Sequence, residues 1–148
     1  MFSRILTVCV GNICRSPMAQ ALLASRLAKR APWTTVASAG LSALIGAPAD
    51  PLACELLARR GVTLDAHRAR QLTPELVTES DLVLVMTAEQ QRAVSHLVPA
   101  ARGRVQRLGR FGGFDVADPY GRGRAEFERA LALVERGVDD YVNAFWPA

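Results

Sequence analysis

The stretch from residue 5 to residue 23 constrains the fold most, because it passes from a strand to a helix through one short loop. The unbroken apolar run at residues 5–8 is typical of a central strand in a parallel sheet. The loop at residues 9–16 reads Cys-Val-Gly-Asn-Ile-Cys-Arg-Ser, and Pro17 then suits the first turn of a helix. The sequence therefore predicts a strand, a tight loop and a helix at the start of the chain.

Strands and helices alternate along the rest of the chain. The further strands are expected at residues 34–37, 81–86 and 103–108. The helices are expected at residues 18–30, 51–60, 88–97 and 127–145, with a short one from residue 74. This alternation predicts an α/β fold in which a parallel sheet carries helices on both faces. Residues 1–148 contain no repeat, linker or composition shift, so we expect one domain.

The loop at residues 9–16 has the features of an anion site. Its backbone N–H groups can point inward, and the N-terminus of the following helix adds partial positive charge. Gly11 permits a positive φ or a close backbone approach, and Arg15 offers a planar fork to two phosphate oxygens. Cys9 lies at the base of the loop, where positive surroundings favour the nucleophilic thiolate. The residues expected to surround a phosphate are Val10, Gly11, Asn12, Ile13, Cys14, Arg15 and Ser16.

Hydrolysis of a phosphate monoester by a cysteine also needs a proton for the leaving oxygen. Asp118 stands before Pro119 in a long loop rich in glycine and arginine, and Asp115 lies three residues earlier. On the sequence alone these two carboxylates are equal candidates for the proton donor. No group of His, Cys and carboxylate residues has the spacing of a metal site, so neither a metal nor another cofactor is expected.

Two motifs resemble those of the low-molecular-weight protein tyrosine phosphatases. Residues 9–17 match the family's phosphate loop, and Asp118-Pro119-Tyr120 matches its second signature. The resemblance extends over essentially the whole chain and includes residues 38–40 (Ser-Ala-Gly) and 69–71 (Ala-Arg-Gln). It implies a three-layer sandwich built on four parallel strands.

The resemblance also implies the roles of single residues. Cys9 would be the nucleophile that forms a cysteinyl-phosphate, Arg15 would bind the phosphate, and Asp118 rather than Asp115 would be the general acid. Asn12, Ser16 and His67 would support the loop. The slot for the substrate ring would be formed by Leu41, Leu44 and Tyr120.

The loop sequence bears on the substrate. Ile13 is a branched aliphatic residue that packs well against a phenyl ring, whereas related arginine phosphatases carry Thr at this position. Residues 38–46 look most like the bacterial branch associated with capsule or exopolysaccharide production. That likeness implies a phosphotyrosine protein as substrate, in particular a membrane-bound tyrosine autokinase.

The sequence disfavours two other classes of function. An arsenate reductase of the same fold needs further cysteines near the third strand, and residues 82–92 contain none. A binding module with an inactive site is disfavoured by the intact Cys9, Arg15 and Asp118. The lead interpretation is therefore a protein tyrosine phosphatase.

The composition of the chain limits the partners and the location that we expect for it. A net charge of +4 suits an enzyme for a phosphate dianion, and we expect no nucleic acid partner. Three cysteines without paired spacing form no disulfide framework, which indicates a reducing, cytoplasmic location. No apolar stretch is long enough to cross a membrane, and we expect a monomer. Cys14 is either a small buried residue or the partner of Cys9 in a reversible disulfide.

Overall fold

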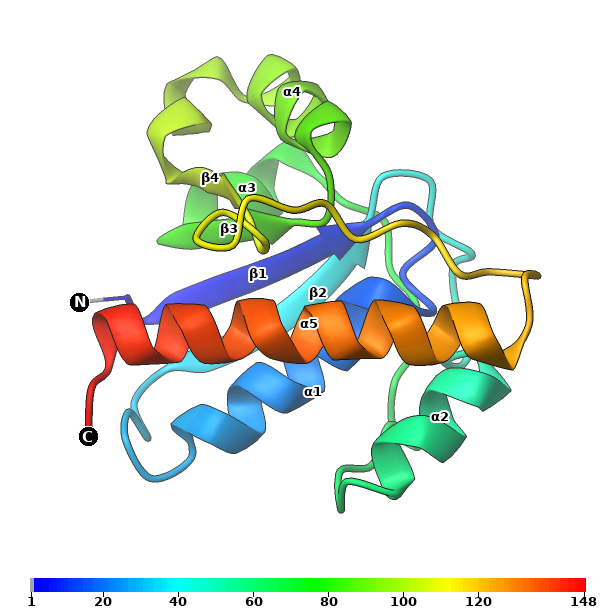
Figure 1. Cartoon of the computed structure of the whole chain (residues 1–148). Helices are drawn as coiled ribbons and strands as arrows, with labels where there is room; N and C mark the ends of the chain where they lie inside the picture. The colour runs from blue at the N-terminus through cyan, green and yellow to red at the C-terminus, as the bar shows by residue number, and fades with distance from the viewer. Residues whose placement is uncertain (1) are drawn as a thin grey trace.

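The computed structural model describes residues 2–148 and contains a parallel sheet with four strands (Figure 1). The strands are β1 (Arg4–Cys9), β2 (Thr35–Gly40), β3 (Leu82–Val85) and β4 (Val105–Arg107). Their order in space is β2-β1-β3-β4, and every neighbouring pair is parallel. The first strand of the sequence is thus an inner strand with a partner on each side, as its apolar run predicted.

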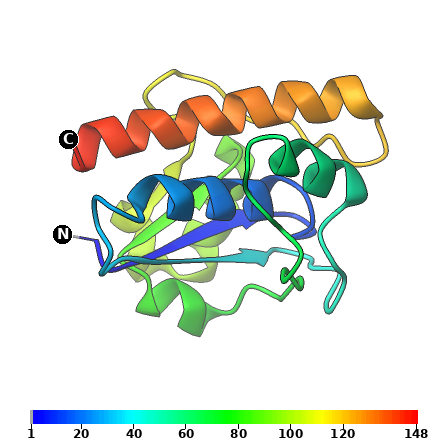
Figure 2. The same ribbon diagram turned by 90° about the horizontal axis from the view of Figure 1, so that it is seen from below.

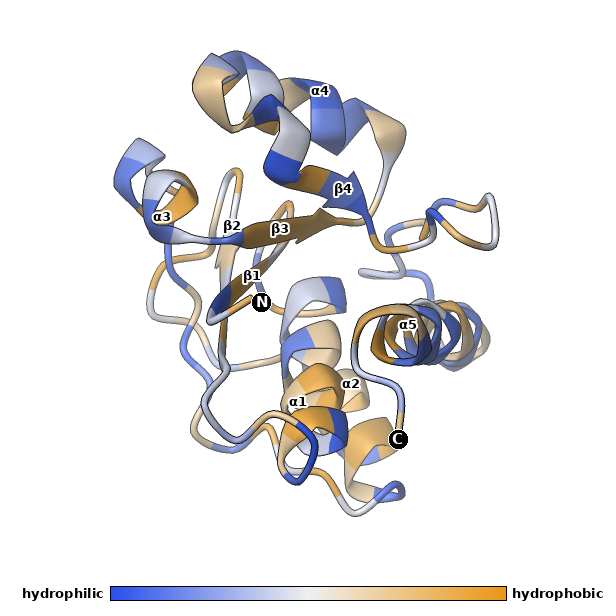
Figure 3. Cartoon of the chain, turned by 90° about the vertical axis from the view of Figure 1, so that its left-hand side faces the viewer, coloured by the Kyte–Doolittle hydropathy of each residue, from blue (hydrophilic) through white to orange (hydrophobic). Residues whose placement is uncertain are grey.

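Helices cover both faces of this sheet (Figure 3). One face carries α1 (Arg15–Leu27), α2 (Pro51–Ala58) and the long α5 (Arg124–Phe145). The other face carries α3 (Pro74–Glu79), α4 (Ala88–Leu97) and the 3₁₀ helix η1 (Pro99–Arg104). Figure 2 shows α1 and α5 packed beside each other on one side of the sheet. The predicted three-layer α/β sandwich is confirmed.

The two inner strands bury side chains on both faces because both faces are covered. Ile5 and Leu84 belong to the core cluster under α1, α2 and α5. Leu6, Val8 and Val83 belong to the cluster under α3 and α4. This double burial explains why β1 and β3 read as continuous apolar runs rather than as alternating patterns.

Several element boundaries differ from the sequence predictions. Helix α1 ends at Leu27, β4 covers only Val105–Arg107 because residues 99–104 form η1, and α5 starts at Arg124. Helix α1 starts at Arg15 rather than at residue 18, so Pro17 lies within its first turn, where its missing N–H costs nothing. Strand β2 continues to Gly40 because it pairs along its whole length with β1, ending with Gly40 opposite Cys9. Helix α2 ends at Ala58, and Gly61 lies in the turn beyond it with φ +73°.

The side chains of Asp50, Thr73 and Thr87 cap α2, α3 and α4, since each accepts a hydrogen bond from a backbone N–H in the first turn of its helix. None of the helices within residues 2–148 combines the length and the apolar character needed to span a bilayer.

Candidate active site

The loop at residues 9–16 connects the carboxyl end of β1 to the first turn of α1. Parallel α/β sheets bind ligands at this edge. Cys9 is the last residue of β1 and is only 2% exposed. The loop turns at Asn12, which has a left-handed backbone with φ 59°. The residue with positive φ is therefore Asn12 and not Gly11, and asparagine tolerates this conformation better than most residues.

The buried Asn12 side chain braces the loop from inside. Its Nδ2 donates to Ser16 Oγ at 2.8 Å and to Ser38 Oγ at 2.9 Å, while the backbone N–H of Arg70 donates to its Oδ1 at 2.9 Å. The Nε2–H of His67 donates to the Asn12 carbonyl oxygen at 2.7 Å. The structure thus brings together the three residues predicted to support the loop, Asn12, Ser16 and His67.

Two further residues support the loop, although no local sequence pattern assigns them this role. Ser38 donates from Oγ to Gln20 Oε1 at 2.6 Å, and Gln20 Nε2 donates to the Val36 carbonyl oxygen at 3.2 Å. Ser38 belongs to the Ser-Ala-Gly motif at residues 38–40. That motif is the only feature of the sequence that points to a role for Ser38. Nothing in the sequence distinguishes Gln20 from any other polar residue of α1.

The Cys9 sulfur lies 2.9 Å from Ser16 Oγ. Ser16 Oγ already accepts a hydrogen bond from Asn12, so its own hydrogen is free to point at the sulfur. Ser16 is the second residue of α1 and makes no capping bond, since the N-cap position is Cys14. The Ser16 hydroxyl therefore serves as a donor to the Cys9 sulfur and not as a helix cap.

Arg15 reaches the loop from the first position of α1. Its guanidinium is almost fully buried and donates from Nη1 to the Val116 carbonyl oxygen at 2.8 Å. Its Nη2 lies 3.7 Å from Asp118 Oδ2. Its Nε is buried without an acceptor among residues 2–148, so this N–H is available to an anion at the loop.

A cavity of about 190 Å³ opens over the loop. The residues that line it are Cys9, Val10, Gly11, Ile13, Cys14, Arg15, Ser42, Leu44, Asp118 and Tyr120. Leu44 and Tyr120 are both about half exposed and lie at its rim. Leu41, the third residue predicted for the slot, does not line the cavity and packs against the core under α3 and α4.

The structure separates the two candidate carboxylates. Asp118 lines the cavity, and its Oδ1 accepts a hydrogen bond from the Tyr120 N–H at 3.0 Å. Asp115 does not line it. The Asp115 carboxylate instead accepts hydrogen bonds from Arg107 Nη1 at 2.9 Å and from the Ala88 N–H at 3.2 Å.

Cys9 and Cys14 are both free cysteines that line this cavity. Burial raises the pKa of the Cys14 thiol well above its usual range, and the nearby charge of Asp50 acts in the same direction. Cys14 is therefore held as the thiol, which is a poor nucleophile. The disulfide between these two cysteines stays a prediction.

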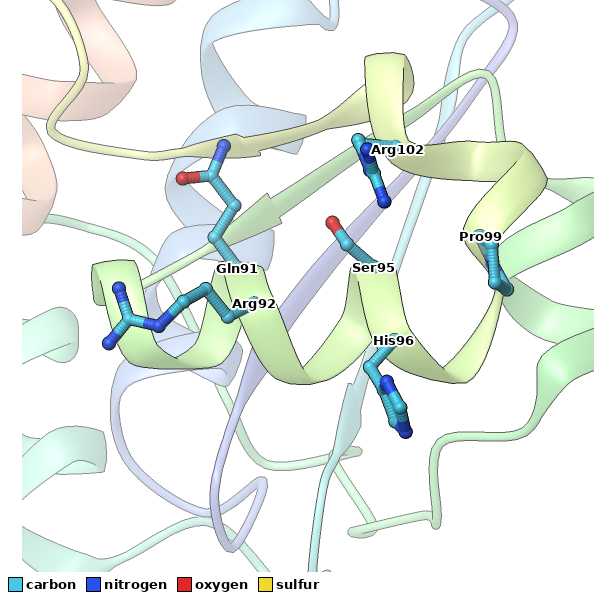
Figure 4. A pocket seen from close by; sticks show the side chains of 6 residues that line it. All are labelled: Gln91, Arg92, Ser95, His96, Pro99 and Arg102. Carbon is cyan, nitrogen blue, oxygen red and sulfur yellow. The ribbon is translucent and has the colours of Figure 1, made fainter.

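A larger hollow of about 490 Å³ lies on the opposite face of the sheet, between α4 and η1. Figure 4 shows the Ser95 hydroxyl and the His96 ring pointing away from each other on α4. This hollow therefore contains no paired nucleophile and base. No three His, Cys, Asp or Glu side chains in the described part of the chain are grouped so as to hold a metal ion.

Comparisons with known proteins agree with this fold. A family model described as low molecular weight phosphotyrosine protein phosphatase matches residues 4–145. The probable low molecular weight protein-tyrosine-phosphatase EpsP of Ralstonia nicotianae is 50% identical over 142 residues, which cover 96% of this chain and 95% of that protein.

Two solved structures are also similar to this chain. Vibrio vulnificus Wzb in complex with benzylphosphonate has a TM-score of 0.91 at 37% identity, covering 98% of this chain and 100% of that chain. The YwlE arginine phosphatase from Geobacillus stearothermophilus has a TM-score of 0.87 at 34% identity, covering 96% and 92% respectively. The fold is thus common to phosphatases of more than one kind.

Proposed function

The chain belongs to the low molecular weight phosphotyrosine protein phosphatase family, and we propose that it hydrolyses phosphotyrosine in proteins through a cysteinyl-phosphate intermediate. One observation carries this proposal. A cysteine, a buried arginine and a carboxylate, namely Cys9, Arg15 and Asp118, line a single small cavity at the carboxyl edge of the sheet.

In the first step the Cys9 thiolate attacks phosphorus in line with the tyrosine oxygen. The S–P bond forms as the P–O bond to tyrosine breaks, and Asp118 donates its proton to the departing oxygen. The backbone N–H groups of the loop and the guanidinium of Arg15 bind the three equatorial oxygens, where charge is spread in the transition state. The Ser16 hydroxyl, 2.9 Å from the sulfur, stabilises the thiolate.

In the second step water attacks phosphorus from the side that tyrosine has left. The Asp118 carboxylate takes the proton of this water, the S–P bond breaks, and inorganic phosphate leaves with the Cys9 thiolate restored. One carboxylate thus serves first as acid and then as base. Its half-exposed position at the cavity gives it access both to the leaving oxygen and to water.

The walls of the cavity favour an aryl phosphate. Ile13, Leu44 and Tyr120 present apolar surface above the loop, and a phenyl ring packs well against such surface. A relative binds benzylphosphonate, which joins an aromatic ring to a phosphonate as phosphotyrosine joins one to a phosphate. We therefore propose phosphotyrosine rather than phosphoarginine as the substrate.

The physiological partner is proposed by likeness. This chain is similar to EpsP and Wzb, and its sequence resembles the bacterial branch associated with capsule and exopolysaccharide production. We propose that the substrate is a phosphorylated tyrosine on a membrane-bound autokinase, and that the enzyme works as a cytoplasmic monomer.

The mechanism is tested by steady-state hydrolysis of p-nitrophenyl phosphate and of a phosphotyrosine peptide in the presence of EDTA. Cys9→Ser should abolish turnover of both substrates. Asp118→Ala should lower kcat by roughly 10²–10⁴-fold, the usual contribution of a general acid. Ser95→Ala, in the hollow beside α4, is the control and should behave as wild type.

Turnover by Cys9→Ser at the parent rate would rule out the thiolate mechanism. Hydrolysis of phosphoarginine in preference to phosphotyrosine would overturn the substrate assignment. Loss of all activity in EDTA, restored by a divalent metal, would show that the reaction needs a metal that the proposed mechanism does not use.

A further inference from the structure

We propose that Asp115 is a positioning residue for the general acid, acting through the loop that carries Asp118. This inference rests on the proposed function, because it concerns the placement of the proton donor. Asp115 does not touch the cavity, and its carboxylate is tied instead to two separate elements of the fold.

The Asp115 carboxylate bridges the end of β4 and the start of α4. One oxygen accepts from Arg107 Nη1 at 2.9 Å, and the same nitrogen lies 3.2 Å from the Phe114 carbonyl oxygen. The other oxygen accepts from the N–H of Ala88 at 3.2 Å. Ala88 is the first residue of α4, where the helix dipole also favours a negative charge. The carboxylate is thus satisfied on both oxygens.

The arginine that binds Asp115 is itself held in place. The buried Tyr141 of α5 donates its hydroxyl to the Arg107 carbonyl oxygen at 3.0 Å. Arg107 is also the last residue of β4 and is in register with Val85. Asp115 is therefore anchored to a rigid part of the molecule and not to another loop.

Asp118 has no comparable anchor of its own. Its side chain is 50% exposed, and its closest contacts are Tyr120 N in the same loop and Arg15 at 3.7 Å. The loop is fixed two residues earlier, where Val116 donates its N–H to the Met86 carbonyl and accepts from Arg15. Asp115 directly precedes Val116. Its two hydrogen bonds therefore fix the start of the segment that leads to Asp118.

Loss of the Asp115 carboxylate should therefore misplace Asp118 without removing it. A misplacement of about 1 Å in a catalytic group can cost about 10²-fold in rate. We expect Asp115→Ala to lower kcat about tenfold with little change in KM. The loss should grow as the leaving phenol becomes less acidic, because only poor leaving groups depend strongly on the proton donor.

The decisive measurement is a double-mutant cycle between Asp115 and Asp118, followed by kcat on a series of aryl phosphates. If Asp115 acts through Asp118, Asp115→Ala should cost nothing further in the Asp118→Ala background. Asp115→Asn keeps the shape and one acceptor oxygen, so it should fold as wild type and recover part of the activity.

Asp139→Ala is a matched control. Asp139 pairs with Arg26 at 2.9 Å and is 49% exposed, against 2.9 Å and 43% for Asp115 with Arg107. Loss of the Asp139 carboxylate should leave kcat unchanged. The Asp139–Arg26 pair joins α1 to α5, and neither residue lines the cavity.

Three outcomes would overturn the proposal, and they are distinguishable. Wild-type kcat in Asp115→Ala would show that the anchor is dispensable. An equal loss in the parent and in the Asp118→Ala background would place the effect on the fold or on the phosphate loop. Full activity of Asp118→Ala, with Asp115→Ala inactive, would make Asp115 the acid and would also refute the proposed mechanism.

Discussion

At the scale of single residues, the orientation of the Asn12 amide decides the direction of the hydrogen bonds around Cys9. The Asn12 Oδ1 atom accepts from the backbone of Arg70, so both hydrogens of its Nδ2 must go to Ser16 and Ser38. Ser16 therefore has only its own hydrogen to offer the Cys9 sulfur. A backbone contact on the far side of the loop thus orients the hydroxyl donor toward the proposed nucleophile.

We expect Ser16→Ala to lower kcat about tenfold to hundredfold while the fold is kept. A hydrogen bond to a charged group contributes about 1.5–3 kcal/mol, and each 1.36 kcal/mol is about tenfold in rate. The measurement is kcat on an aryl phosphate, with Ser16→Thr as the variant that keeps the hydroxyl. Equal activity of Ser16→Ala and wild type would show that the 2.9 Å contact does not stabilise the thiolate.

At the scale of elements, the end of β2 supports the phosphate loop through close backbone contact. Gly40 is the last residue of β2 and lies opposite Cys9 in the sheet. A Cβ atom at Gly40 would lie 2.5 Å from the Val10 carbonyl oxygen and 3.0 Å from the backbone nitrogen of Asn12. Both neighbours are parts of the loop that cannot move without distorting the anion site.

Gly40→Ala should therefore reduce both stability and activity. Overpacking typically costs about 1–3 kcal/mol, and the displaced loop should also bind phosphate less well. Thermal unfolding and the inhibition constant for inorganic phosphate measure the two effects. Gly103→Ala is the control, because a Cβ atom there has no neighbour within 4 Å. If both alanine variants matched wild type, the close approach of β2 to the loop would have no effect on stability or on phosphate binding.

At the scale of the whole molecule, a hydrogen bond connects α5 to the carboxyl end of β4. The buried Tyr141 hydroxyl donates to the Arg107 carbonyl oxygen at 3.0 Å, and Arg107 in turn holds Asp115. Burial raises the pKa of Tyr141 to about 12 from its ordinary value of 10.0. The phenol therefore keeps its proton, and with it this hydrogen bond, to a higher pH than a free tyrosine would.

This shift predicts how stability depends on pH. The folded state keeps the Tyr141 proton to a higher pH than the unfolded state, so the contribution to stability is complete below pH 10 and is lost between pH 10 and about 12. Urea unfolding at pH 8 and pH 11 should show this fall in wild type. Tyr141→Phe should be less stable at pH 8 by about 0.5–1.5 kcal/mol, because one hydrogen bond is lost, and should lack this part of the alkaline fall. The same alkaline fall in both proteins would assign it to other groups.

Local patterns were sufficient for most elements of the fold. The apolar run at β1 predicted an inner strand, and the predicted starts of α2, α3 and α4 at residues 51, 74 and 88 agree with the structure. The end of β2 was missed because residues 38–40 (Ser-Ala-Gly) are small and carry no strand signal of their own. Only pairing with the neighbouring strand β1 makes them a strand.

The sequence by itself determined the order of strands and helices and the loop at residues 9–16, and it led to the proposal of Cys9 and Arg15 as site residues, because these depend on neighbours in the chain. The tertiary structure decided the rest. In the structure Asp118 lines the cavity, whereas Asp115 bonds to the start of α4. Leu41 packs against the core under α3 and α4, and Gln20 and Ser38 support the loop. These assignments depend on contacts between residues far apart in sequence, which no local pattern encodes.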